Sequence, residues 1–278
     1  MKKILSFFVL FCFAVNANAA DLTASLQKTY LSCVGIDDML SDMKKIAGIN
    51  TAVTGVGTVA GGAALIVGIK KNQELFGSLK KIEDKGGVVY SGELTVEYQK
   101  NFEKNLKSTN AKKLGNWRTG LLAVNAATNV AGAILATKNT NNEGLDEKIQ
   151  SCISALDELH STLMQARAEN IDISEANAIY NACSEYKYID LSVIQKRAKG
   201  AQISSIIGGG VGVAGAVTSH IANNSTEADK MKNLDTVSNV LAGGATALSG
   251  AATVFNATQI SAIKKVANVA QQCESLLK

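Results

Sequence analysis

The segment from Ala47 to Ile69, AGINTAVTGVGTVAGGAALIVGI, has 23 residues without a charge and is rich in glycine and alanine. Lys44 and Lys45 precede it, and Lys70 and Lys71 follow it. A helix of this length could cross the hydrocarbon core of a bilayer, which is about 30 Å thick. In water, each glycine inside a helix costs about 1 kcal/mol relative to alanine. The segment therefore predicts a long helix whose glycines are compensated by close approach to another helix.

Three further segments share this composition: Thr119 to Thr137, Ala201 to Ala222 and Val237 to Ala257. In all four, small residues recur four positions apart and so lie on one face of a helix. This spacing resembles that of glycine-zipper helices, in which small side chains let two backbones approach. The predicted helix-packing residues are Gly57, Gly61, Gly208, Gly212, Gly243 and Gly244.

Two short patterns occur twice in the chain. Tyr30-Leu-Ser-Cys33 returns as Tyr180-Asn-Ala-Cys183, and the Q-x-C-x-S-x-L pattern around Cys152 returns around Cys273. Two of the apolar segments lie between the members of each pair. The same features in the same order predict a duplication, with a first repeat at 20–170, a second at 171–278 and a helical insertion at 72–111 in the first.

The spacing of the cysteines predicts their pairing. The arms from Cys33 to Lys71 and from Lys112 to Cys152 have nearly equal lengths, as do the corresponding arms of the second repeat. If each arm is helical it is about 60 Å long, and two antiparallel arms bring their cysteines level. We therefore expect disulfides Cys33–Cys152 and Cys183–Cys273.

The fold class follows from composition and periodicity. The chain has no proline in 278 residues, and proline is normally used at strand edges and turns. Apolar residues follow helical spacing in two stretches, which are Leu22, Leu26, Tyr30, Cys33, Leu40, Met43 and Ile46, and Leu145, Ile149, Cys152, Leu156, Leu159 and Leu163. We expect an all-α protein of two tandem antiparallel helical hairpins, with Gly/Ala-rich packing seams and disulfides.

The first 19 residues have the features of a secretory signal peptide. Met1-Lys2-Lys3 is followed by an apolar run from Ile4 to Val15 and then by small residues ending at Ala19. Cleavage after Ala19 would also remove Cys12, which leaves four cysteines in an oxidising compartment. The expected location is therefore the periplasm, the cell envelope or the medium.

The sequence contains no residue pattern that specifies a reaction. Its only histidines are His160 and His220, and Asp157, Glu158 and His160 are the kind of charged group found on exposed helix surfaces. The glycine-rich run at Gly208 lacks the Lys-Ser/Thr of a phosphate-binding loop. We assign no catalytic, cofactor-binding or metal-binding residue. A formal charge of +4 before cleavage gives no reason to expect nucleic acid.

Two functions stay open at this point. The first is a non-enzymatic structural or interaction module of the cell envelope, with an unidentified protein partner or another copy of itself. The alternative is a membrane-inserting or pore-forming protein that uses the four apolar segments. Polar residues within these segments, including Asn50, Asn125 and Asn129, argue against the alternative because they lower the hydrophobicity.

Overall fold

The computed structural model describes residues 17–79, 92–140 and 143–277, and all regular secondary structure in these ranges is helical. The elements are α2 (Ala17–Cys33), α3 (Ile36–Phe76), α5 (Gly92–Ser108), α6 (Ala111–Thr140), α7 (Glu143–Ala168), α8 (Ser174–Ser184), the 3-10 helix η1 (Glu185–Tyr188), α9 (Ser192–Asn223) and α10 (Ala228–Leu277). The all-α prediction is confirmed for this part of the chain. Most of the predicted signal peptide, and part of the predicted insertion at 72–111, lie outside the described residues.

The chain forms two compact units. Unit 1 consists of Met1–Lys45, Asn141–Ile194 and Ser261–Lys278, and unit 2 consists of Ile46–Thr140 and Gln195–Ile260. Each unit takes segments from both predicted repeats, so the units do not follow the division at residue 170. The tandem repeat and its correspondence to two separate hairpins stay predictions.

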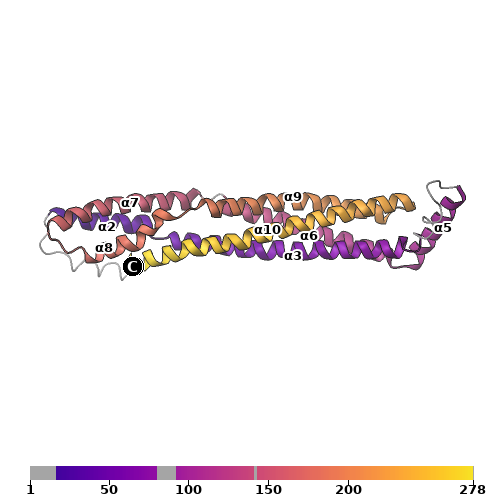
Figure 1. Ribbon diagram of the computed structural model, residues 1–278, viewed down its shortest axis with the longest axis horizontal. Helices are drawn as coiled ribbons and strands as arrows, with labels where there is room; N and C mark the ends of the chain where they lie inside the picture. Colours follow the sequence, from indigo (N-terminus) through magenta and orange to yellow (C-terminus); the bar gives the residue numbers. More distant parts are fainter. Residues whose placement is uncertain (1–16, 80–91, 141–142, 278) are drawn as a thin grey trace. The chain divides into compact units, whose positions relative to one another are not determined.

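Unit 2 is a bundle built from α3, α6, α9 and α10, which run alongside one another (Figure 1). A Cβ added at Gly57 would lie 2.5 Å from Thr128 Oγ1 of α6, and one at Gly208 would lie 3.2 Å from Leu248 of α10. Further along α9, Gly215 faces Leu241. The residue number of the contact in α10 falls as that of the glycine in α9 rises, so the two helices are antiparallel. This direction agrees with the antiparallel arms expected from the cysteine spacing.

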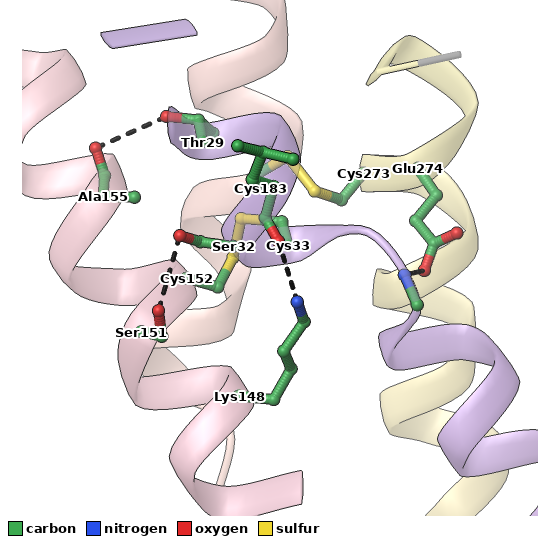
Figure 2. The surroundings of a disulfide bond; sticks show 12 residues. Thr29, Ser32, Cys33, Lys148, Ser151, Cys152, Ala155, Cys183, Cys273 and Glu274 are labelled. Carbon is green, nitrogen blue, oxygen red and sulfur yellow. Dashed lines mark hydrogen bonds between the residues drawn. A yellow bond between two sulfur atoms is a disulfide. The ribbon is translucent and has the colours of Figure 1, made fainter. Parts of the chain in front are cut away.

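Unit 1 is held by two disulfides. Cys33 is bonded to Cys152 and Cys183 to Cys273, the pairs expected from the arm lengths. Helices α2 and α7 pack antiparallel, since Lys28 pairs with Glu158 while Lys148 Nζ donates to the carbonyl oxygen of Leu31. Figure 2 shows the Lys148 bond beside the two bridges, together with the bonds from Thr29 to the carbonyl oxygen of Ala155 and between Ser151 and Ser32. The predicted apolar residues of α7 are buried: Leu145, Ile149, Cys152, Leu156, Leu159 and Leu163.

The first predicted helical stretch, from Leu22 to Ile46, is not continuous. Helix α2 ends at Cys33 and α3 begins at Ile36, with Gly35 between them at φ +93°. Glycine tolerates this left-handed conformation because it lacks a Cβ. The amides of Gly35 and Asp37 donate to Glu274 Oε1 at 3.1 and 3.0 Å, so a carboxylate from α10 satisfies the freed N–H groups of the α3 N-terminus.

Within the predicted insertion at 72–111, helix α3 extends to Phe76 and α5 spans Gly92–Ser108. Tyr98 and Phe102 of α5 are buried in an apolar cluster at this end of the bundle. The other buried members of the cluster are Leu75, Leu79, Ala111, Ala228 and Met231.

Candidate functional site

The polar and apolar side chains of unit 2 have an inverted distribution. Of the 25 large apolar side chains that are exposed in the described part of the chain, 20 belong to unit 2. Of the 19 buried polar or charged residues among those that the structure describes, 16 belong to unit 2. Unit 1 has the usual arrangement of a protein in water, with a core of leucines, isoleucines, alanines and four cysteines. The interior of unit 2 is therefore the candidate functional site.

Amide and hydroxyl side chains connect the four helices inside unit 2. Near the start of its α3 segment, Asn50 Nδ2 donates to Asn256 Oδ1 at 3.1 Å. Thr253 Oγ1 lies 3.0 Å from Thr54 Oγ1, one turn further along α3. Both bonds join α3 to α10 between buried or half-buried residues. They hold two long helices together by directional contacts.

Asn125 and Asn129 of α6 form the centre of this polar interior. Asn125 Nδ2 donates to the backbone carbonyl oxygen of Gly57 at 2.6 Å and to Ser249 Oγ at 3.0 Å. Asn129 Nδ2 lies 2.6 Å from the same Ser249 Oγ. All three side chains are fully buried, so their hydrogen bonds form away from water.

The glycines of the predicted packing seam make room for these side chains. A Cβ at Gly61 would collide with Thr246 Oγ1 and Asn125 Nδ2, and a Cβ at Gly212 would lie 2.9 Å from Asn125 Oδ1. Gly208 similarly faces Asn129 and Leu248.

The remaining two predicted packing residues lie in looser surroundings. No atom lies within 4 Å of a Cβ built at Gly243, and Gly244 has only Val211 at 3.6 Å. In the close contacts, glycine therefore mainly faces polar side chains of neighbouring helices rather than another glycine.

An apolar layer crosses the interior after these asparagines. It consists of Ala64, Leu122 and Ala242, all fully buried, with Leu65, Leu121 and Ala216 packed against them. This layer separates the amide-rich part of the interior from a group of charged side chains.

A charge cluster lies beyond this layer. Lys71 Nζ is 2.9 Å from Asp235 Oδ2, and Arg118 Nη1 is 3.0 Å from Asp235 Oδ1. Arg118 Nη2 also donates to the backbone carbonyl oxygen of Asp235 at 3.1 Å. All three side chains are fully buried, so one carboxylate contacts two basic side chains away from solvent. Gly68 gives Arg118 space, because a Cβ there would lie 2.9 Å from Arg118 Nε.

No known protein family, curated protein or solved structure matches this chain. The function must therefore be argued from the geometry of the molecule alone.

The outer surface of unit 2 is apolar over long stretches. Residues 46–69, 119–137, 200–226 and 236–263 contain no Asp, Glu, Lys or Arg. Four helices of the described chain are long and apolar enough to cross a membrane, and the most apolar 18-residue window of each is only 28–39% buried. The asparagines that lower the hydrophobicity of these segments point into the bundle; they are Asn50, Asn125 and Asn129.

The charged group around His160 has structural contacts. The ring of His160 stacks on Tyr180, Glu158 pairs with Lys28, and Asp157 lies 2.6 Å from Lys187. Asp157 raises the pKa of Lys187 through this hydrogen bond. His220 Nε2 lies 3.2 Å from Asn224 Nδ2 near the end of α9. Among the residues that the structure describes, no three His, Cys, Asp or Glu side chains are placed to hold a metal ion.

Sequence reasoning missed the charge cluster. In the sequence, Lys71 is one of the lysines that follow the first uncharged segment, and Asp235 lies two residues before the last one. Only Arg118 could have been singled out from the sequence, because it is a single charge directly before an uncharged segment. The three residues lie at widely separated positions in the chain, and only the antiparallel pairing of the helices brings them together.

Proposed function

We propose that this protein is a non-enzymatic membrane-inserting protein of the cell envelope, and that unit 2 is the part that enters the bilayer. The observation that carries the proposal is the inverted distribution in unit 2, with apolar side chains outside and polar side chains inside. The disulfides of unit 1 support an exported protein in an oxidising compartment. A polar interior with an apolar exterior matches a bundle whose solvent is lipid.

Different interactions hold helices together in water and in lipid. In water, burial of apolar surface stabilises a bundle by roughly 25 cal/mol per Å², and unit 2 leaves much of this surface exposed. In lipid, the tails are as apolar as the side chains, so close packing and interhelical hydrogen bonds hold helices together. The Asn50–Asn256 and Asn125–Ser249 bonds and the glycine contacts are interactions of this second kind.

The uncharged segments are long enough to cross the hydrocarbon core of a bilayer. Each has at least 19 residues, which gives about 28 Å or more of helix. This is close to the thickness of the hydrocarbon core of a bilayer. Charged residues outside the interior begin only beyond these segments, as at Lys70, Lys138 and Lys264.

The test is a charge placed on the outer surface of unit 2. Val59 is 73% exposed and lies near the middle of the segment 46–69, and Met164 of α7 in unit 1 is 58% exposed. A carboxylate at the centre of a membrane helix costs about 3 kcal/mol, so Val59→Asp is expected to reduce membrane insertion by on the order of 100-fold. Met164→Asp is the matched control and is expected to insert like the unchanged protein. Insertion is measured as resistance to carbonate extraction, after expression of the chain with its predicted signal peptide.

The competing function is a soluble interaction module whose apolar surface is covered by a protein partner or by another copy. A soluble module is released by carbonate without detergent, and Val59→Asp then improves its solubility in water. Either result would overturn the membrane proposal. The sequence analysis placed the soluble module first, and the side-chain distribution now favours insertion.

A further inference from the structure

Helix α5 presents a basic face at one end of unit 2. It belongs to the insertion between α3 and α6 and lies beside the end of the bundle (Figure 1). The inference about this face rests on the proposed insertion of unit 2 in a membrane, because it concerns the lipid at which that insertion takes place.

The inner side of α5 is held firmly against the bundle. Phe102 is fully buried and stacks on Phe76 of α3, with 5.7 Å between the ring centres. Gln99 Nε2 donates to the carbonyl oxygen of Thr226 at 2.9 Å, and its Oε1 accepts from the amide of Ala228 at 3.1 Å. Gln99 therefore joins α5 to the turn before α10.

A second amide fixes the other end of the helix. Asn105 Nδ2 donates to the carbonyl oxygen of Leu75 at 2.9 Å and to Ser78 Oγ at 3.0 Å. These contacts, together with the buried rings, determine which side of α5 faces outward.

The outward side carries three exposed lysines at helical spacing, Lys100, Lys104 and Lys107. They line a shallow hollow together with Glu103 and Ser108. In the part of the chain that the structure describes, none of the three lysines forms an ion pair, and Glu103 accepts a hydrogen bond from Gln99. Three ammonium groups without an ion pair to any described residue, and a hydroxyl, surround this hollow and are suited to a phosphate group.

Neighbouring residues extend the positive charge towards the apolar surface. Lys112 and Lys113 are exposed on the first turn of α6, and Lys70 is exposed on α3 just after the uncharged segment. Trp117, one turn beyond Lys113, is 65% exposed. An exposed Trp between a lysine cluster and an apolar surface is typical of the boundary between lipid headgroups and tails.

We propose that the basic face of α5, defined by Lys100, Lys104 and Lys107, docks on the phosphate headgroups of anionic phospholipids. The charge is complementary, and the hollow is open to an approaching surface. The anionic surface attracts each basic residue by about 1 kcal/mol, so three lysines change binding by on the order of 100-fold. This attraction brings unit 2 to the membrane before its apolar exterior enters the lipid.

The experiment compares two triple variants of the full chain, after circular dichroism has shown that both are as helical as the unchanged protein. One is Lys100→Gln with Lys104→Gln and Lys107→Gln. The charge-matched control is Lys44→Gln with Lys264→Gln and Lys265→Gln, all exposed lysines of unit 1. Binding is measured by flotation with vesicles of phosphatidylglycerol and phosphatidylcholine in a 3:7 ratio, and with vesicles of phosphatidylcholine alone.

The α5 variant is expected to bind the anionic vesicles on the order of 100-fold more weakly than the unchanged protein, and the control variant less than about tenfold more weakly. High salt is expected to reduce this difference, because it screens exposed charges. Equal weakening in both variants, or equal binding of the unchanged protein to both vesicle types, would overturn the docking proposal. Failure of the proposed function would give a different result from failure of the docking proposal. Carbonate would then release the unchanged protein from both vesicle types.

Discussion

At the scale of single residues, glycine and asparagine act together in unit 2. Asn125 Nδ2 lies 2.9 Å from the position of a Cβ at Gly61 of α3, and its Oδ1 lies 2.9 Å from the position of a Cβ at Gly212 of α9. One amide thus occupies space left by glycines on two helices. A buried amide without hydrogen bonds costs several kcal/mol in an apolar medium, so each such contact specifies which helices are neighbours.

Two glycines of α9 provide a matched test of this role. A Cβ at Gly212 would lie 3.2 Å from the backbone Cα of Ala126, whereas nothing lies within 4 Å of a Cβ at Gly210. Gly212→Ala is expected to destabilise unit 2 by about 1–3 kcal/mol through overpacking. Gly210→Ala is expected to leave stability unchanged or to raise it, because alanine is the better helix former. Thermal unfolding in detergent, followed by circular dichroism, measures both, and equal midpoints for the two variants would contradict the assigned contact.

Asp235 is expected to be the most sensitive member of the charge cluster. Asp235→Asn leaves Lys71 and Arg118 buried without a counter-charge, and loss of one partner of a buried ion pair costs about 3–5 kcal/mol. Lys71→Met leaves the balanced Arg118–Asp235 pair and is expected to cost clearly less. Asp229→Asn, at an exposed position on the same helix, is the control and should change stability by less than about 1 kcal/mol. The free energy of unfolding in denaturant would rank the three variants, and a larger loss for Lys71→Met would refute this arrangement of charges.

At the scale of elements, the two units use different means of holding helices together. In unit 1, leucines and isoleucines of α7 are buried against α2, and disulfides join α2 to α7 and α8 to α10. In unit 2, small residues and amides replace large apolar side chains. The periodicity of α7 predicted its buried face correctly because one side of that helix is apolar. In α3 and α6 the apolar side faces outward, so the same reasoning could not find the interior.

A buried tyrosine in the 3-10 helix η1 is expected to make the stability of unit 1 depend on pH. Tyr186 is fully buried, and its hydroxyl has no hydrogen-bond partner among the described residues. Burial raises the pKa of Tyr186 above its ordinary value of 10.0, and the carboxylates of Glu274 and Asp37 raise it further. The folded protein therefore keeps this proton at a pH where the unfolded chain loses it. The stability that Tyr186 contributes is complete below about pH 10 and decreases as the pH rises above that value.

Tyr186→Phe is expected to remove this alkaline loss, which amounts to at most about 1.4 kcal/mol per pH unit. Tyr188→Phe is the matched control, because Tyr188 is 81% exposed. Denaturant unfolding at pH 8, 10 and 11, without added thiol, measures the effect. The same pH dependence in both variants would show that Tyr186 does not titrate as its burial requires.

At the scale of the whole molecule, the disulfides and the apolar segments are properties of different units. The Cys33–Cys152 and Cys183–Cys273 bridges belong to unit 1, whereas the uncharged segments belong almost entirely to unit 2. The chain passes between the units several times, so neither unit is a continuous piece of sequence. For this reason the comparison of Val59→Asp with Met164→Asp tests each unit separately within one chain.

The amino-acid sequence alone determined the helical fold class and the cysteine pairing. These depend on composition and on distances along a helix, which are local quantities. Only the tertiary structure decided that Asn50, Asn125 and Asn129 face inward, that Lys71, Arg118 and Asp235 meet, and that unit 2 exposes its apolar side chains. The physical reason is that a helix with small residues on one side and apolar residues on the other has two candidate buried faces. Contacts between residues far apart in the sequence determine which face is buried.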